Sequence, residues 1–181
     1  MEDKDLKQVR LERRLAHKAH IFTVYEDRLK MPDGHEAIYD VLTHKGAAAV
    51  VPVLDNGKIV MVRQYRNAVN RVTLEVPAGG RDNTEEPFEE AAVRELEEET
   101  GYCCNVLEHL VTLNTVVAFS DEVVEVFVAK ELTKTATCFD PDEFIEIKEY
   151  ELKELVEMIY KGEIRDSKTV SAIMSYAYSI K

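Results

Sequence analysis

The chain has 181 residues, a formal net charge of −12 and 45% hydrophobic residues. This length suits one domain, or one domain with a small extension. The negative charge disfavours nonspecific binding to nucleic acid or to an anionic membrane, although a bound cation can invert the field locally. No apolar run approaches the roughly 20 residues of a membrane span, and the three cysteines form no disulfide framework. We therefore expect a cytoplasmic protein with no membrane or nucleic-acid partner.

The first half of the chain has the pattern of strands joined by tight turns. The segment Met31-Pro32-Asp33-Gly34 separates two stretches rich in β-forming residues, which predicts a hairpin near the N-terminus. A second turn is expected at Asp55-Asn56-Gly57, because Asn-Gly is among the strongest short hairpin signals. The strands expected around and after these turns span 20–29, 37–43, 47–54, 58–64 and 72–76.

The second half combines strands with helices. A helix is predicted over 87–100, since Pro87 suits a first helical turn, Leu96 favours helix, and Gly101 follows as a stop. Strands in both halves of the chain with few helices between them favour an α+β fold over a regular alternation of strand and helix. The remaining expected elements are strands at 106–117, 122–129 and 144–150 and helices at 151–160 and 168–180.

Glutamate is concentrated within this predicted helix and just before it. Residues 85–99 contain eight glutamates and a single arginine, Arg94. Glu95, Glu98 and Glu99 have the i, i+3, i+4 spacing that places three carboxylates on one helix face. The cluster is either a solvated acidic face or a cation site. Without thiols or imidazoles, it favours a hard ion such as Mg²⁺, Mn²⁺ or Ca²⁺.

The spacing around the cluster is specific. Gly80 is followed after five residues by Glu86, and after seven more by Arg94-Glu95-Leu96-Glu97-Glu98-Glu99-Thr100-Gly101-Tyr102. All nine specified positions match the Nudix box, Gly-x5-Glu-x7-Arg-Glu-U-x-Glu-Glu-x-Gly-U, where U is a bulky apolar residue. The chain thus resembles Nudix hydrolases. This resemblance implies mixed sheets packed with helices, an α/β/α sandwich, with an N-terminal β-hairpin extension.

The resemblance also implies a metal site. By matching positions, Glu95 and Glu99 are expected to be the principal Mg²⁺ ligands, with Glu98 as a third ligand that also serves catalysis, and Mn²⁺ as a possible substitute. A backbone carbonyl just before the box is expected to complete the shell. The chain has two glycines there where many relatives have one, so the carbonyl of either Ala78 or Gly79 is a candidate.

Four other box positions have implied roles. Arg94 is expected to act in catalysis as a positioning residue that pairs with a box carboxylate instead of binding substrate. Glu86 is expected near the metal shell or as a brace for the loop. Gly80 and Gly101 are expected to permit tight backbone at either side of the helix.

Segments outside the box resemble the ADP-ribose pyrophosphatase branch of the family. These are 62–66, with sequence Val-Arg-Gln-Tyr-Arg, and 74–79, with sequence Leu-Glu-Val-Pro-Ala-Gly. The resemblance implies that Arg66 contacts phosphate, which suits the bidentate geometry of arginine, with Arg63 as a second substrate contact. The alternative is a surface arginine after a strand. Glu75 is expected either to reach the metal shell or to be a surface residue at a strand end.

A general base and an adenine site are also needed. The branch has its base on a loop after the box, which favours Glu143, then Asp142; Glu122 is a further candidate or a brace. The alternative is an acidic surface loop. Phe22 and Tyr39, on the two arms of the first hairpin, are candidates for the aromatic face against adenine, or else belong to the core.

The expected reaction is Mg²⁺-dependent hydrolysis of ADP-ribose to AMP and ribose 5-phosphate. The alternatives are the same chemistry on a GDP- or ADP-hexose, and a noncatalytic Nudix module that binds a metabolite and regulates a partner. We expect an N-terminal extension at 1–44 and a Nudix domain at 45–181. An isolated hairpin is marginal in water, so the extension is expected to form a homodimer and reach the partner's site, or else to fold back on its own domain.

Overall fold

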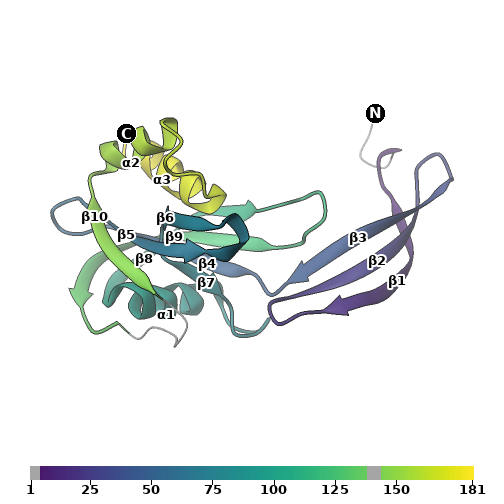
Figure 1. The fold of residues 1–181 in the computed structure, drawn as a ribbon, viewed down its shortest axis with the longest axis horizontal. Helices are drawn as coiled ribbons and strands as arrows, with labels where there is room; N and C mark the ends of the chain where they lie inside the picture. Colours follow the sequence, from purple (N-terminus) through teal and green to yellow (C-terminus); the bar gives the residue numbers. More distant parts are fainter. Residues whose placement is uncertain (1–4, 138–143) are drawn as a thin grey trace. The chain divides into compact units, whose positions relative to one another are not determined.

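The computed structural model describes residues 5–137 and 144–181, which form two compact units (Figure 1). The first unit comprises residues up to 45 together with 114–123, and the second comprises 46–113 and 124–181. Assignment of 114–123 to the first unit was not predicted from the sequence. In the described residues, no helix has both the length and the apolar character needed to cross a membrane.

The first unit is built on a three-stranded antiparallel sheet of order β1-β2-β3. Its strands are β1 (Val9–Lys18), β2 (Phe22–Lys30) and β3 (Glu36–His44). The predicted hairpin is β2 and β3, closed by hydrogen bonds from Met31 N to His35 O and from Gly34 N to Met31 O. The predicted hairpin is therefore present, and the sheet contains one further strand, β1, that was not predicted.

Strand β1 was not predicted from the sequence. Val9, Leu11 and Leu15 alternate with polar residues, but Arg13 interrupts the pattern and six of the ten residues are polar or charged. All ten residues are exposed, and charged side chains link the strand to β2. Arg13 donates two hydrogen bonds to Asp27, each 2.7 Å long, and Arg14 pairs with Glu26. Cross-strand pairs of opposite charge stabilise a sheet without burying apolar surface, so this strand forms without adding a buried residue.

The 114–123 connection contacts the end of β3. Leu42 N donates to Phe119 O at 2.7 Å, and Asp121 N donates to Leu42 O at 3.1 Å. His44 N donates to the carboxylate of Asp121 at 2.9 Å. These bonds add a short parallel bridge to the sheet, between Leu42 and Ser120.

The described residues of the second unit form two sheets and three α-helices. One sheet has the order β7-β4-β9-β8, in which β4 is antiparallel to β7 and parallel to β9. The other has the order β10-β5-β6 and is antiparallel. The strands are β4 (Ala47–Pro52), β5 (Ile59–Arg66), β6 (Arg71–Glu75), β7 (Ala78–Gly80), β8 (Tyr102–Asn114), β9 (Val123–Lys134) and β10 (Ile145–Tyr150); a 3₁₀ turn, Asn67–Val69, follows β5. The helices are α1 (Phe88–Thr100), α2 (Leu152–Tyr160) and α3 (Ser167–Ser179).

The second predicted turn forms, but its strands separate. Leu54 N donates to Lys58 O, and Gly57, with φ 83°, closes the turn. Only one bridge, between Val53 and Ile59, joins the two arms, and β4 and β5 then enter different sheets. Each arm contains a run of four or more consecutive buried residues, 48–52 in β4 and 59–62 in β5, so these runs are buried on both faces rather than on one.

Strand β4 lies between two cores. Ala49 and Val51 belong to a cluster with α2 and α3, whereas Ala48 and Val50 belong to a cluster with α1. Alternate side chains of a strand point to opposite faces, so this single strand contacts helices on both sides. Figure 1 shows α1 on one side of the sheets and α2 with α3 on the other. The predicted α+β class, with mixed sheets packed between helices, is confirmed.

The helix of the box begins at Phe88, one residue later than predicted. Pro87 is its N-cap, with extended dihedrals (φ −60°, ψ 144°), rather than a residue of the first turn. Gly101 ends the helix in the left-handed conformation, φ 66°, and its N–H returns to Glu97 O. That dihedral favours glycine, so the predicted stop is confirmed.

Candidate active site

Two carboxylates of α1 contact the segment that precedes the box. Glu99 is 3% exposed and accepts a hydrogen bond of 3.0 Å from Ala78 N. The carboxylate of Glu95 lies against Gly79, so that a Cβ at this glycine would overlap it. The helix and strand β7 are therefore held together by acidic side chains, and the backbone of 78–79 lies beside them.

Arg94 links four groups of the box. Its guanidinium donates to Glu86 at 3.2 Å, to Glu95 at 2.7 Å, to Glu98 at 3.2 Å and to Gly80 O at 3.0 Å. Burial opposes its charge, but the hydrogen bonds to Glu86 and Glu95 outweigh burial and raise its pKa. Arg94 thus makes the carboxylate contacts expected of a positioning residue; its part in catalysis stays a prediction.

Glu86 braces the loop in front of the helix. Its carboxylate accepts a 2.5 Å hydrogen bond from Asp82 N as well as the bond from Arg94. The hydrogen bond from Arg94 is the main cause of a lowered Glu86 pKa. Of the two roles left open for Glu86, these contacts are those of a loop brace.

The steric need for glycine lies one residue earlier than predicted. Gly80 was expected to permit tight backbone, yet its φ is not positive, and a Cβ there would be 4.0 Å from the nearest atom, Gly46 O. Gly79 is the residue that has no room for a Cβ. The expectation for Gly80 is corrected accordingly. The two consecutive glycines were the signal in the sequence. The spacing of the box assigned the sterically required glycine to Gly80, whereas in the structure it is Gly79.

Arg66, whose side chain is partly exposed, forms an ion pair with the buried carboxylate of Glu75 beside this cluster. Arg66 donates to both oxygens of Glu75, at 2.9 and 2.8 Å, and Thr73 donates to the same carboxylate at 2.6 Å. The hydrogen bond to Glu75 is the main cause of the raised Arg66 pKa, and the charge of Glu99 contributes. Arg66 therefore lies within the field of a predicted metal ligand, and Glu75 is not the surface residue that its alternative supposed, because it is 2% exposed.

Two residues of α3 that the sequence analysis did not predict contact Glu75 and the residue after it. Lys168 donates a hydrogen bond to Glu75, and Thr169 accepts one of 3.0 Å from Val76 N. Asp166, the N-cap of α3, accepts from both. An Asp three residues before a Thr at the start of an apolar-patterned helix is a cap signal, but nothing local connects it to Glu75, 93 residues away.

The donors at the start of the box suit a hard divalent ion. Carboxylates and backbone carbonyls are the ligands of Mg²⁺, and this ion keeps several waters with few protein ligands. In the described ranges, no three His, Cys, Asp or Glu side chains are arranged to hold a metal. Arg94 Nη1 donates to both Glu95 and Glu98, so it lies between two of the predicted ligands.

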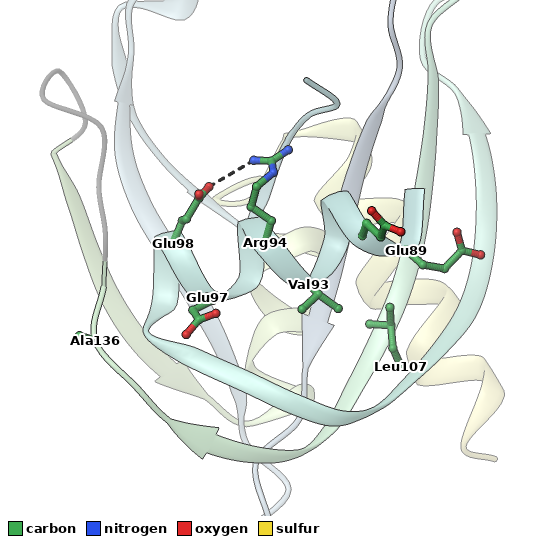
Figure 2. Close-up of a pocket in the computed structure, with 8 residues that line it drawn as sticks. Glu89, Val93, Arg94, Glu97, Glu98, Leu107 and Ala136 are labelled. Atoms are coloured by element: carbon green, nitrogen blue, oxygen red, sulfur yellow. Dashed lines mark hydrogen bonds and ion pairs between the residues drawn. The ribbon is translucent and has the colours of Figure 1, made fainter. Parts of the chain in front are cut away.

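A cavity of about 630 Å³ runs along a neighbouring side of α1 (Figure 2). Figure 2 shows the hydrogen bond between Arg94 and Glu98 on one side of α1. Val93 of α1 and Leu107 of β8 lie on another side of the helix. Four of the five charged side chains that line it are glutamates, so its wall repels a diphosphate. The lining residues are Glu89, Glu90, Val93, Arg94, Glu97, Glu98, Leu107 and Ala136.

Some predicted site residues are not brought together within the chain. Arg63 is three residues from Arg66 on β5, hence on the opposite face, and pairs with Glu146 of β10. Phe22 opposes His44 in the register of β2 and β3, and Tyr39 opposes Asp27. These two positions are five residues apart along β2, on opposite faces, and roughly 17 Å apart at about 3.4 Å per residue.

Of the three candidates for the general base, Glu122 alone lies within the described residues. Glu122 lies in the first unit, where it accepts a 2.6 Å hydrogen bond from Thr115 and pairs with His44 at 3.3 Å. Glu143 and Asp142 lie outside the described residues. Their assignment remains a prediction from the sequence.

Comparison with known proteins identifies the family. The model of the NUDIX domain matches residues 43–173. The chain is 38% identical over 170 residues to an ADP-ribose pyrophosphatase of Bacillus subtilis, covering 90% of this chain and 91% of that protein. It is 40% identical over 149 residues to a "Methanol dehydrogenase activator" of Bacillus methanolicus, covering 81% and 80%. A crystal structure of an ADP compounds hydrolase superposes with a TM-score of 0.85 at 22% identity, covering 96% and 94%. With the complete box and the matching fold, the chain belongs to the Nudix family and is a pyrophosphohydrolase of the Nudix type, similar to ADP-ribose pyrophosphatases.

Proposed function

We propose that the chain hydrolyses the pyrophosphate bond of ADP-ribose to AMP and ribose 5-phosphate, with Mg²⁺ as the metal and Mn²⁺ as a substitute. The observation that carries the proposal is the contact of Glu95 and Glu99 with the Ala78–Gly79 segment, next to the ion pair of Arg66 and Glu75. Carboxylates and a guanidinium meet there, which suits a metal-bound diphosphate.

Arg66 is the proposed phosphate contact. Its Nε and Nη2 are bound to Glu75, and in the described parts of the chain its Nη1 makes no hydrogen bond. The Nη1 group is thus available to a phosphate oxygen, while Glu75 fixes the plane of the guanidinium. Arginine gives such contacts both charge and direction.

The metal ligands we propose are Glu95, Glu99, Glu98 and the carbonyl of Ala78. When bound, Mg²⁺ neutralises the diphosphate oxygens and activates a water molecule. Arg94 donates to Glu95 and Glu98, and its proposed role is to position these two carboxylates. Glu75 is fully occupied by Arg66, Thr73 and Lys168, so we propose it as a brace of the phosphate site instead of a metal ligand.

The proton from the attacking water is assigned to Glu143, with Asp142 second. This assignment is carried by the resemblance of 140–146 to the loop that bears the base in the ADP-ribose pyrophosphatase branch. A carboxylate beside a bound cation needs only modest tuning of its pKa for this role.

The test is a substrate panel. The protein is incubated with Mg²⁺ and with ADP-ribose, ADP-glucose, GDP-mannose and NADH, and products are identified by mass spectrometry. We expect AMP and ribose 5-phosphate, and the highest kcat/KM with ADP-ribose. A GDP- or ADP-hexose with the higher kcat/KM would replace the substrate and leave the reaction class intact.

A second candidate function is regulation of a dehydrogenase. The observation in its favour is the 40% identity to a protein named as a methanol dehydrogenase activator. The complete set of box carboxylates argues against a noncatalytic module, so this function would accompany hydrolysis. Adding the protein to a methanol dehydrogenase, as wild type and as the Glu99→Gln variant, tests whether it activates that enzyme and whether hydrolysis is required.

We further propose a homodimer in which the N-terminal extension, predicted at 1–44, contributes to the partner's site. Its support is the exposed apolar surface of the first unit, where Val9, Leu15 and Ile38 are 53%, 56% and 70% exposed. Because Phe22 and Tyr39 lie on opposite faces of the sheet, we do not expect both to contact the same adenine ring.

Light scattering tests the oligomer, and a monomer at micromolar concentration would exclude it. Mixing inactive Glu99→Gln protein with an inactive Phe22→Ala, Tyr39→Ala protein tests the shared site. If sites are shared, mixed dimers regain activity. Activity that stays absent after verified subunit exchange shows that each site is built within one chain. A cytoplasmic location remains a prediction from the sequence.

A further inference from the structure

Two adjacent residues in the first turn of α3 contact Glu75, the last residue of β6, and Val76, which follows it. This stretch leads into the Ala78–Gly79 segment. Lys168, whose side chain is 17% exposed, bonds the buried carboxylate of Glu75. Thr169, fully buried, accepts the hydrogen bond of Val76 N at 3.0 Å. One contact holds a side chain and the other holds the next backbone group, so both the position and the orientation of Glu75 are fixed.

Asp166 ties these two anchors into one unit. Its carboxylate accepts from Lys168 Nζ at 2.9 Å, from Thr169 Oγ1 at 2.7 Å and from Thr169 N at 3.0 Å. The last of these bonds is the N-cap of α3. The lysine and the threonine are thus set by the start of a helix, which is more rigid than a loop.

The charges of this network explain why a lysine is present. Glu75 lies between two cations, Arg66 on one side and Lys168 on the other, and Lys168 shares the carboxylate oxygen that Arg66 Nη2 uses. With Lys168 present, the two cations balance the carboxylates of Glu75 and Asp166, so the four side chains carry no net charge. Without Lys168, the remaining three carry a net charge of −1, which weakens the attraction of Arg66 for an anion.

We propose that Lys168 is a positioning residue for substrate binding: with Thr169 it holds Glu75, and through Glu75 it sets the orientation and the effective charge of Arg66 toward a phosphate. The ligand class is a diphosphate. The inference rests on the proposed role of Arg66 as a phosphate contact, and it assigns to α3, at the far end of the chain, a part in the affinity of the site for its substrate.

A purely structural role makes a different prediction. If the network only anchored α3, loss of Lys168 would lower the melting temperature and leave KM unchanged. If it positions Arg66, loss of Lys168 weakens ground-state binding of the diphosphate and leaves kcat nearly unaltered, which is a split between KM and kcat.

The experiment compares Lys168→Met, which keeps the length of the side chain, with Lys168→Arg, which keeps the charge. We expect Lys168→Met to raise KM roughly 3- to 10-fold, the size typical of a change that acts through a neighbour, with kcat within about twofold, and Lys168→Arg to restore KM. Lys161→Met is the matched control, since Lys161 is 62% exposed and pairs only with Glu157 of its own helix among the described residues. An unchanged KM in Lys168→Met overturns the proposal.

A second readout does not depend on turnover. The Nε–H of Arg66, assigned in ¹⁵N spectra with an Arg66→Lys variant, is expected to exchange slowly with solvent in the wild type and faster in Lys168→Met. Thr169→Val is expected to act in the same direction, and Thr169→Ser to restore slow exchange. Exchange that is unchanged in both Lys168→Met and Thr169→Val overturns the positioning role. If the wild type hydrolyses no ADP-ribose, the proposed function fails, and this measurement still decides whether Lys168 holds Glu75 and Arg66.

Discussion

The carboxylate of Glu95 lies so close to the backbone of Gly79 that a Cβ at this glycine would overlap it, whereas a Cβ at Gly80 would be 4.0 Å from the nearest atom. The space available for a side chain therefore differs between these two adjacent glycines. The difference matters because Glu95 is a proposed metal ligand and Gly79 precedes the first residue of the box.

Gly79→Ala is therefore expected to displace the Glu95 carboxylate. The side chain is flexible enough to rotate, so the fold survives, but a ligand displaced by about 1 Å costs up to ~10²-fold in rate. Gly80→Ala is the matched control and is expected to keep activity within a few-fold. Steady-state kinetics with thermal unfolding of both variants checks this. Equal losses in the two variants would mean that the Glu95 contact has no part in the rate.

Substitution of the proposed metal ligands is expected to lower kcat more than Gly79→Ala does. Glu95→Gln and Glu99→Gln are expected to lower kcat by about 10³-fold or more, because a ligand charge is lost where charge develops in the transition state, while the fold survives. Glu90→Gln, an exposed position on the same helix, is the control. Calorimetric titration with Mg²⁺ should show weakened binding in the two site variants alone; near-normal turnover in both would remove the metal assignment.

The proposed general base can be separated from the ligands. Glu143→Gln is expected to keep Mg²⁺ affinity and to lose roughly 10²–10⁴-fold in kcat, the range for a lost general base. Asp142→Asn is the comparison. A collapse of metal affinity in Glu143→Gln would make this residue a ligand, and a loss confined to Asp142→Asn would move the base to that position.

Stability at low pH should depend on Glu75. Burial opposes its charge, but Arg66, Lys168 and Thr73 outweigh burial and hold its pKa at about 2, below the ordinary 4.5. A lowered carboxylate pKa stabilises the fold above pH 4.5, and this contribution, of the order of 3 kcal/mol for a shift of this size, is lost as the pH falls from 4.5 toward 2.

Glu75→Gln is expected to be less stable than the wild type at pH 7 and to lose less stability on acidification. The free energy of unfolding, measured by urea titration between pH 7 and pH 3, gives the difference between the two proteins. That difference isolates Glu75, because the other carboxylates are common to both. A constant difference across this range would show that Glu75 does not titrate with a lowered pKa.

Local chemistry in the sequence determined much of the fold. The helix of the box, its stop at Gly101 and the turns at 31–34 and 55–57 were each predicted from a few adjacent residues and are present. The reason is that caps, turns and helix faces are decided within one or two turns of chain, where side-chain type and spacing act directly on the backbone. The family and the grouping of Glu95, Glu98 and Glu99 followed from the same local spacing.

Only the tertiary structure decided what lies far apart in the sequence. Strands β4 and β5 enter different sheets after a shared turn, and β1 is linked to β2 by ion pairs without burying any of its residues. Gly79, and not Gly80, is the residue without room for a Cβ. The tertiary structure also brings Lys168 to Glu75 across 93 residues. Single polar residues such as these have no periodicity, and their partners are set by how sheets and helices pack, so the sequence alone cannot pair them.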